Sequence, residues 1–328
     1  MNDVTPAKSF VVTRDHGPAP AALKGAVVAL GNFDGVHRGH RQVIAAALER
    51  AGALDRPAAV LTFEPHPRAF FNPREPLFRL TDEIGKLRLL AATGLDGAVV
   101  MTFDAALASL SAQQFVDRIL VGRLAVSGVV AGANFHFGHR RAGSTDFLAA
   151  QGVARGFAVD VVPVFSYRGR PVSSGPIREA LTAGDIREAS DLLGYPWFVT
   201  GTVIEGDRRG RELGYPTANM KLDPGCRLRH GIYAVRVGIG DERHDGVASF
   251  GLRPMFPTEP LLEVFLFDFS GDLYGARLDV AFIGWIREEM KFAGVAELVA
   301  QMGKDGAAAR AVFGAAPNAF PPLGKIER

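Results

Sequence analysis

The chain has 328 residues, of which 48% are hydrophobic and 22% charged, and its formal net charge at pH 7 is +2. This balance is typical of a globular protein of about two domains. Positive and negative residues are mixed along the chain, which argues against a nucleic-acid-binding arm. The single cysteine, Cys226, excludes an intramolecular disulfide and fits a reducing compartment. No signal-peptide pattern and no apolar run near the ~18 residues of a membrane span are present, so we expect a cytoplasmic protein.

The first part of the chain alternates short apolar strands with amphipathic helices. This alternation predicts a mostly parallel sheet with right-handed crossovers. Helix starts are marked by Thr81, by a capping box of Ser111 with Gln114, and by Ser144. The expected strands lie at residues 26–30, 58–63, 97–103, 126–131 and 157–164. The residues before about 25 are expected to form a leading strand or an arm.

The second part is richer in strands. A short helix at 176–183 and a capping pattern of Asp185 with Glu188 come first, and we place the domain junction near residues 185–196. Short strands separated by turn residues then predict a closed or sandwiched antiparallel β domain. These strands are expected at 198–204, 231–237, 247–250, 262–269 and 278–283, followed by helices at 295–302 and 307–313 and a loose tail from 318.

The turn after the first long strand, GNFDGVHRGH at residues 31–40, is the most distinctive stretch. It joins a buried strand to an amphipathic helix, which is where open α/β sheets bind ligands. Its glycines allow close backbone approach, and a helix start offers N–H groups to phosphate. His37 and His40 would lie one turn apart on one face, where imidazoles near neutral pH donate to phosphate oxygens and carry part-time positive charge. A glycine-rich turn with two solvated histidines is the alternative.

Two further segments follow the second and fourth strands. His66 in the stretch EPHP is either a ligand or part of a strand terminator, and both interpretations stay open. Asn134 could hydrogen-bond a ligand edge, and Phe135 or Phe137 could line the wall for an aromatic ring. One of these two phenylalanines is expected in the core instead.

A third segment precedes the helix at 176–183. Ser173 and Ser174 at a helix start would form a second phosphate cradle, and Arg178 would add a fixed positive charge. Arg178 alone would be interpreted as a solvated helix arginine. Beside the two histidines, we interpret it as a phosphate ligand.

The second part also carries candidate ligands. Gly206 and Gly210 lie in a loop that could approach phosphates as a flap. Thr217 and Asn219 supply oxygen ligands of the kind that Mg²⁺ accepts, although PTAN could be a simple turn. Glu263 lies inside an apolar strand, where an unpaired charge is costly, so it either faces outward or takes a proton from an attacking hydroxyl.

In their order, these motifs resemble those of bifunctional riboflavin kinase/FAD synthetases of prokaryotic type. H-x-G-H is the signature of the nucleotidyltransferase superfamily, and the ten residues 31–40 are similar to the form in FAD synthetases. The segment 134–138 is similar to their D/N-F-x-F-G element, and 173–178 to S-S-T-x-I-R with Gly175 in place of threonine. The string from Gly201 to Asn219 closely resembles the riboflavin kinase motif, and the strings at 246–256 and 268–275 are also similar to that family. Met255 and Phe265 depart from the family pattern, which commonly has threonine and histidine at these positions.

The resemblance implies a role for each matching residue. Catalysis is assigned to His37, His40, Arg178 and Glu263. Nucleotide contacts are assigned to Gly31, Asn32, Phe33, Gly39, Ser173, Ser174, Gly206, Gly210 and Pro216. Flavin contacts are assigned to Asn134, Phe135, Arg287 and Phe292, and Mg²⁺ contacts to Thr217 and Asn219. For Arg287 with Phe292, which match an R-x-x-x-x-F element, the alternative is a barrel-to-helix connector.

The fold class implied is a Rossmann-like nucleotidyltransferase α/β domain over 1–186, followed by an antiparallel β-barrel riboflavin kinase domain with C-terminal helices over 187–328. The second would phosphorylate riboflavin with ATP, and the first would join FMN to AMP, giving FAD and pyrophosphate. Expected partners are ATP, Mg²⁺, riboflavin, FMN and FAD, without nucleic acid or membrane; transient self-association stays open.

Three alternative functions are weighed against this interpretation. Another adenylyltransferase of the superfamily would leave the second domain unexplained. A class I aminoacyl-tRNA synthetase is discounted because no K-M-S-K-S string occurs. A non-catalytic flavin- or nucleotide-binding regulator would not need the full set of candidate catalytic residues.

Overall fold

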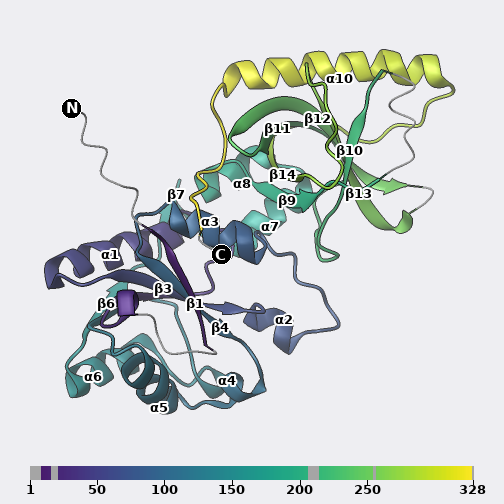
Figure 1. The fold of residues 1–328 in the computed structure, drawn as a ribbon. Coiled ribbons are helices and arrows are strands. Elements are labelled where there is room, and N and C mark those ends of the chain that lie inside the picture. Colours follow the sequence, from purple (N-terminus) through teal and green to yellow (C-terminus); the bar gives the residue numbers. More distant parts are fainter. Residues whose placement is uncertain (1–8, 16–20, 206–213, 254–255, 327–328) are drawn as a thin grey trace, which may run out of the picture. The chain divides into compact units, whose positions relative to one another are not determined.

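The structure, a computed structural model, describes residues 9–15, 21–205, 214–253 and 256–326 (Figure 1). By its contacts the chain forms two compact units. The first unit comprises Met1–Pro76, Glu83–Ser173 and Pro322–Arg328, and the second comprises Leu77–Asp82 and Ser174–Pro321.

The first unit is built on a six-stranded sheet in the order β1-β4-β3-β2-β5-β6, with every pairing parallel. Its strands are β1 (Val11–Arg14), β2 (Val27–Leu30), β3 (Ala58–Glu64), β4 (Gly97–Thr102), β5 (Gly128–Gly132) and β6 (Ala158–Val162). The five predicted strands are confirmed with small shifts at their ends, and the leading segment forms β1. The strand order reverses between β2 and β5, and doubly wound sheets bind their ligands at the carboxyl ends of the strands at such a reversal.

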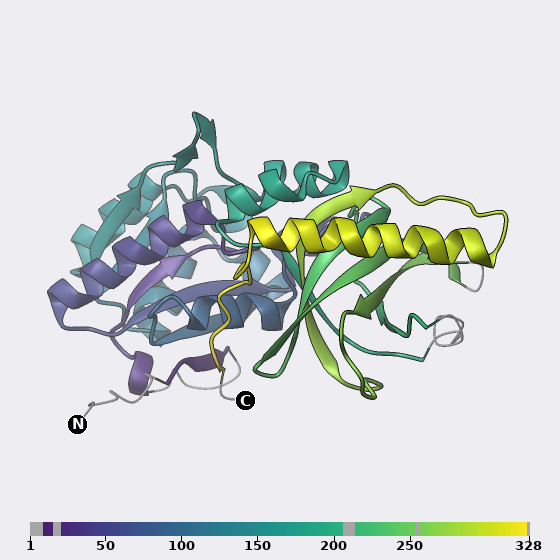
Figure 2. The same cartoon turned by 90° about the horizontal axis from the view of Figure 1, so that it is seen from above.

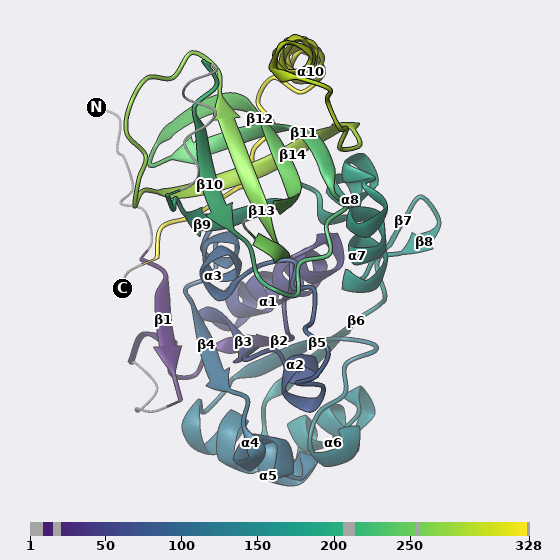
Figure 3. The ribbon, with the colours of Figure 1, turned by 90° about the vertical axis from the view of Figure 1, so that its right-hand side faces the viewer.

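Helices cover both faces of this sheet. Figures 1 and 3 show α1 (Arg38–Leu54) and α3 (Glu83–Ala91) on one face, with α4 (Ala105–Ser109), α5 (Ala112–Phe115) and α6 (Thr145–Arg155) on the other. Short elements complete the unit: α2 (Pro67–Phe71), η1 (Ala21–Leu23), η2 (Val116–Arg123), η3 (His139–Arg141) and the hairpin β7 (Ser166–Tyr167) with β8 (Arg170–Pro171).

The capping signals were good predictors of helix starts. Ser111 and Gln114 form both halves of a capping box, and the Ser144 side chain accepts from the Phe147 N–H at the start of α6. In the second unit Asp185 caps α8 in the predicted way. Thr81 lies two residues before the first residue of α3 and belongs to the second unit.

The second unit contains an antiparallel sheet in the order β10-β13-β12-β11-β14-β9. Its strands are β9 (Phe198–Thr202), β10 (Thr217–Lys221), β11 (Gly231–Ile239), β12 (Glu242–Arg253), β13 (Phe256–Leu266) and β14 (Arg277–Arg287). Beyond β9, the Ile204 N–H donates to the Asn219 carbonyl at 2.8 Å, which joins the two edges and makes the sheet a nearly closed barrel (Figure 3). The predicted β domain is therefore confirmed, but the stretch that includes PTAN forms a strand, β10, which the sequence did not indicate.

In the described part of the second unit, three helices accompany the barrel: α7 (Ser174–Ala183), α8 (Ile186–Leu193) and α10 (Val295–Ala315). The prediction of two C-terminal helices is wrong, because α10 runs without a break through Gly303 and Gly306 and lies along the barrel (Figure 2). Its apolar residues Ala309 and Phe313 pack on Ala234 and Phe267, and this contact outweighs the low helix propensity of glycine.

The expected loose tail is packed in its described part. The Phe320 ring lies 4.2 Å from the Arg243 guanidinium in the second unit. In the first unit, the Gly324 N–H donates to the Arg88 carbonyl at 2.8 Å. Among the described residues, no helix is long and apolar enough to cross a membrane.

Candidate active sites

The loop between β2 and α1 has an unusual backbone. Phe33 and Val36 take φ values of 51° and 34°, which bulky and β-branched residues rarely adopt, and Gly35 takes 79°. Phe33 is buried, and a Cβ at Gly31 would come within 3.2 Å of its ring. Such strain persists only where the surroundings enforce it, and it concentrates at functional sites. The loop lies between a strand and a helix at the carboxyl edge of the sheet, as the sequence predicted, and the strand order places it at the switch point.

His37 and His40 are brought together at the start of α1. The His37 Nδ1 accepts from the His40 backbone N–H at 3.2 Å, so His37 is the N-cap of the helix. The two imidazoles stack with centroids 3.6 Å apart and planes 15° from parallel. Because Nδ1 is the acceptor, the proton of neutral His37 lies on Nε2, where it can serve as a donor.

His40 lies in a less polar environment than the sequence suggested. Its Nδ1 has no hydrogen-bond partner in the described part of the chain, and the Phe33 ring meets it edge-on at 5.2 Å. Burial lowers the pKa of His40 well below its ordinary value of 6.5, and the nearby charges of His37, Lys86 and His66 lower it further. His40 is therefore neutral near pH 7 and acts as a hydrogen-bonding imidazole, in contrast to the predicted part-time charge.

Gly39 explains how these rings fit against the neighbouring loop. A Cβ at this position would lie 3.2 Å from His37 Cε1 and 3.3 Å from the Val172 carbonyl oxygen. Both contacts are tighter than ordinary van der Waals distances, so only glycine leaves the His37 ring where it is.

Sequence reasoning missed one buried charged residue close to the loop between β2 and α1. Lys86, on α3, is 2% exposed and its Nζ lies 2.6 Å from Glu64 Oε1 at the end of β3. The only signal was a lysine inside an apolar helical stretch, which normally indicates a side chain that reaches solvent. His66, whose role was left open, caps α2 by accepting from the Arg68 N–H at 3.1 Å.

The segment after β5 separates its two phenylalanines as expected. Phe137 is buried in the core with its ring 5.3 Å from Phe115, whereas Phe135 is half-buried and stacks on Phe137 at 5.9 Å. Asn134 is exposed and its Oδ1 lies 3.4 Å from the position of a Cβ on Gly132. Asn134 and Phe135 can therefore meet a ligand, and Phe137 supports them.

The serine and arginine candidates divide between the two units. Ser173 is exposed and belongs to the first unit, while Ser174 is the first residue of α7 in the second. The Arg178 Nε donates to the Phe78 carbonyl at 2.6 Å, a contact within the second unit. The catalytic role of Arg178 beside His37 stays a prediction.

In the barrel, the candidate kinase residues form one row. Asn219 on β10 pairs with Glu263 on β13, which in turn pairs with Ser249 on β12. Residues directly opposite on antiparallel strands project from the same face, and Thr217, two residues before Asn219, shares it. Asn219 is buried and Glu263 half-buried. The barrel therefore presents a hydroxyl, an amide and a carboxylate side by side.

The row continues toward α10. Ser249 pairs with Ile232 on β11, which pairs with Arg287 on β14. The Arg287 guanidinium donates to both Asp305 carboxylate oxygens on α10, at 2.8 and 2.6 Å, and its Cζ lies 5.9 Å from the Phe292 ring. Arg287 is thus a barrel-to-helix connector, and a flavin contact stays a prediction.

For the remaining candidates the structure gives a position but no contact that supports the predicted role. Pro216 is exposed just before β10, and the Tyr215 ring lies 5.0 Å from Phe265. Gly206, Gly210 and Met255 lie outside the described residues.

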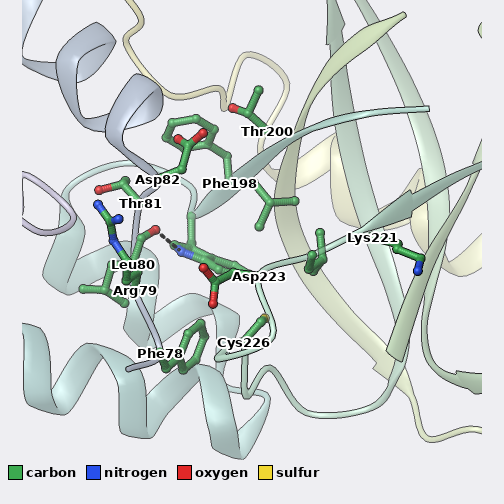
Figure 4. Close-up of a pocket in the computed structure, with 13 residues that line it drawn as sticks. Phe78, Arg79, Leu80, Thr81, Asp82, Phe198, Thr200, Lys221, Asp223 and Cys226 are labelled. Carbon is green, nitrogen blue, oxygen red and sulfur yellow. Dashed lines mark hydrogen bonds between the residues drawn. The ribbon is translucent and has the colours of Figure 1, made fainter. Parts of the chain in front are cut away.

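A cavity of about 80 Å³ lies elsewhere in the second unit (Figure 4). It is lined by residues 78–82, 197–200, 221–223 and Cys226, and the Trp197 indole donates to the Leu80 carbonyl at 2.8 Å beside it. Burial raises the pKa of the Cys226 thiol to about 11, so the thiol stays protonated and unreactive. The candidate catalytic residues do not line this cavity.

Fold and site geometry together define a class. A doubly wound sheet with a histidine-bearing loop at its switch point, followed by a barrel with a Thr-Asn-Glu row, defines a two-domain enzyme that transfers groups from nucleotides.

Comparison with known proteins specifies this class further. The family model for FAD synthetase matches residues 19–176, and that for riboflavin kinase matches residues 193–313. A bifunctional riboflavin kinase/FMN adenylyltransferase of Pseudomonas fluorescens is 43% identical over 302 residues, covering 90% of this chain and 95% of the relative. One from Listeria monocytogenes is 40% identical over 291 residues, covering 88% and 92%. The chain belongs to the bifunctional riboflavin kinase/FMN adenylyltransferase family.

A solved structure agrees with this fold over both units. A Streptococcus pneumoniae crystal structure, described as a macrolide-efflux protein, is 31% identical and has a TM-score of 0.81, covering 92% of this chain and 99% of that one.

Proposed function

We propose that this chain phosphorylates riboflavin to FMN in its second unit and adenylylates FMN to FAD in its first, with ATP as donor in both reactions. Two sites carry the proposal: the His37–His40 stack at the sheet's switch point and the Asn219–Glu263 pair on the barrel. Membership of the bifunctional family supports both activities.

Adenylylation needs no nucleophilic side chain. The phosphate of FMN is already anionic near pH 7, since its second pKa is about 6, so it can attack the α-phosphorus of ATP while pyrophosphate leaves. The chain's task is to stabilise the charge that builds on the phosphates. The His37 Nε2–H, the His40 imidazole and the loop N–H groups are donors for this charge, and we assign Arg178 to the same task.

In the kinase reaction the incoming riboflavin hydroxyl must lose a proton. Glu263 is the carboxylate of the row and is assigned as the base. Thr217 and Asn219 supply a hydroxyl and an amide oxygen on the same face, and a hard cation such as Mg²⁺ accepts oxygen ligands of this kind. Magnesium, when bound there with ATP, would supply positive charge next to the transferred phosphoryl group.

The flavin contacts are assigned to Asn134 and Phe135 in the first unit and to Arg287 and Phe292 in the second. We keep 1–186 and 187–328 as the limits of the two catalytic domains, and the cytoplasm as the compartment, on the grounds given by the sequence. Independence from nucleic acid and membrane, and transient self-association, stay predictions.

A time course with riboflavin, ATP and Mg²⁺, in which the flavins are separated by chromatography, tests the proposal. FMN should rise first and FAD should follow. FMN without FAD would refute the role of the first unit, and conversion of added FMN with riboflavin untouched would refute that of the second. Tight flavin binding without ATP turnover would indicate a regulator.

A further inference from the structure

A buried ion pair lies at the carboxyl end of β3, next to the loop between β2 and α1 (residues 31–37). The Lys86 and Glu64 side chains are 3% and 10% exposed, and their charged atoms are 2.6 Å apart. Removing two charges from water costs several kcal/mol per ion, and apolar residues of similar volume often serve stability as well or better. The pair therefore calls for a role other than stability.

Its hydrogen bonds continue toward the loop. The Lys86 Nζ lies 3.2 Å from Thr62 Oγ1, and the Thr62 hydroxyl donates to the Asn32 carbonyl at 3.0 Å. An ammonium group can only donate, so Thr62 accepts from Lys86 and has its single proton left for Asn32. The direction is thus fixed along the whole relay, from Glu64 through Lys86 and Thr62 to Asn32, and the charge at its start polarises each bond that follows.

The last bond of the relay orients one peptide of the loop. The peptide between Asn32 and Phe33 is planar and trans, so holding its carbonyl toward Thr62 turns the Phe33 N–H to the opposite side. Thr62 is fully buried, so its hydroxyl is held by protein groups and not by bulk solvent. The backbone bond from the Gly31 N–H to the Leu61 carbonyl, at 3.2 Å, fixes the residue before this peptide to β3 as well.

The N–H group that results is poised for an anion. Phe33 is 1% exposed, takes a φ of 51°, and its N–H has no acceptor among the residues that the structure describes. Buried N–H groups without an acceptor are rare in native proteins. Backbone N–H groups beside a left-handed residue form the concave anion sites known from phosphate-binding loops.

We propose that Lys86 and Thr62 are positioning residues of the adenylyl transfer: the relay from Glu64 holds the Asn32–Phe33 peptide so that the Phe33 N–H faces the phosphates of the nucleotide. The inference rests on the proposed function of the first unit. It adds two residues to the site without giving either a contact with substrate. The Lys86 charge, already neutralised by Glu64 on one side, also disfavours protonation of His40.

The matched pair Thr62→Val and Thr62→Ser tests the relay. Valine keeps the shape of the threonine side chain and removes the hydroxyl, whereas serine keeps the hydroxyl and removes a methyl group. Thr62→Val removes the hydrogen bond that holds the Asn32–Phe33 peptide and should raise the KM for ATP in FMN adenylylation about tenfold, which corresponds to about 1.4 kcal/mol. The KM for FMN should stay the same, and Thr62→Ser should restore the KM for ATP to near the wild-type value.

The second unit supplies the internal control, because riboflavin phosphorylation by the same preparations should be unchanged. Lys86→Met combined with Glu64→Gln removes both charges without leaving one unpaired, and should raise the KM for ATP in the same way. An unchanged KM for ATP in Thr62→Val, or an equal rise in Thr62→Ser, would overturn the inference while the wild type still forms FAD. Absence of FAD from the wild-type reaction would overturn the proposed function and the inference with it.

Discussion

Gly39→Ala tests whether the position of His37 is as tightly set as the structure indicates. The new Cβ would lie 3.2 Å from His37 Cε1, 3.3 Å from His37 Nδ1 and 3.3 Å from the Val172 carbonyl oxygen. The backbone carbonyl has little freedom to move, so we expect the imidazole to rotate away by a few tenths of an ångström. The His37 Nε2–H then points away from the position in which it would donate to the phosphates.

The size of the effect follows from how steeply transfer depends on geometry. A displacement of about 1 Å in a reacting constellation can cost about 100-fold in rate, so a smaller shift should lower kcat/KM for FMN adenylylation about tenfold. That loss corresponds to about 1.4 kcal/mol of transition-state stabilisation. Alanine is favoured over glycine in helices by about 1 kcal/mol, which offsets the new contacts and leaves the melting temperature nearly unchanged.

Gly52→Ala is the matched control, because Gly52 lies in the same helix and a Cβ there meets no atom within 4 Å. This variant should gain up to about 1 kcal/mol in stability and keep both activities. Chromatographic assays of FMN-to-FAD and riboflavin-to-FMN conversion would be run on each variant. Wild-type adenylylation by Gly39→Ala would refute the reasoning about His37, and a parallel loss of kinase activity would indicate general misfolding instead.

Three further predictions follow from the sites. Glu263→Gln should lower riboflavin phosphorylation by about 100-fold or more, as expected for a lost general base, and leave FMN adenylylation intact; loss of both would contradict the division between the units. Asp305→Ala removes the carboxylate partner of the half-buried Arg287 guanidinium and should reduce the free energy of unfolding by about 2 kcal/mol, measured by urea denaturation with tryptophan fluorescence, since both tryptophans belong to the second unit; an unchanged midpoint would show that the pair is dispensable. NMR should show that His40 titrates well below pH 6.5. Because the folded state then binds fewer protons than the unfolded state, the free energy of unfolding should fall as the pH drops below about 6.5. His40→Asn should make this dependence of stability on pH weaker.

The sequence predicted best where a local rule decides the structure. A strand, glycines and a helix follow one another directly at 31–40 and predict a turn at the carboxyl edge of the sheet, where the structure has it. The capping box of Ser111 with Gln114 spans only four residues. The pairing of Asn219 with Glu263 supports the proposed kinase site. The sequence could not predict this pairing of β10 with β13, because the two residues are far apart along the chain.

The features that sequence reasoning missed depend on contacts between residues far apart in the chain. The stretch that includes PTAN is a strand because it pairs with β13, and α10 is continuous because its middle turns are held by Asp305 and by packing on the barrel. Lys86 resembled an ordinary surface lysine, since its partners Glu64 and Thr62 lie more than twenty residues before it. The lowered pKa of His40 likewise depends on burial that no local pattern reveals.

The segment Leu77–Asp82 gives the chain an unusual connectivity. Its contacts place it with the second unit, while the residues on both sides belong to the first, so the backbone changes unit at 76/77, 82/83, 173/174 and 321/322. The segment is fixed by the Trp197 indole at the Leu80 carbonyl and by Arg178 at the Phe78 carbonyl. A single proteolytic nick at 173/174 would therefore not release two separate domains: each fragment would still contain a piece of the other's fold, and the halves would have to unfold locally before they could part.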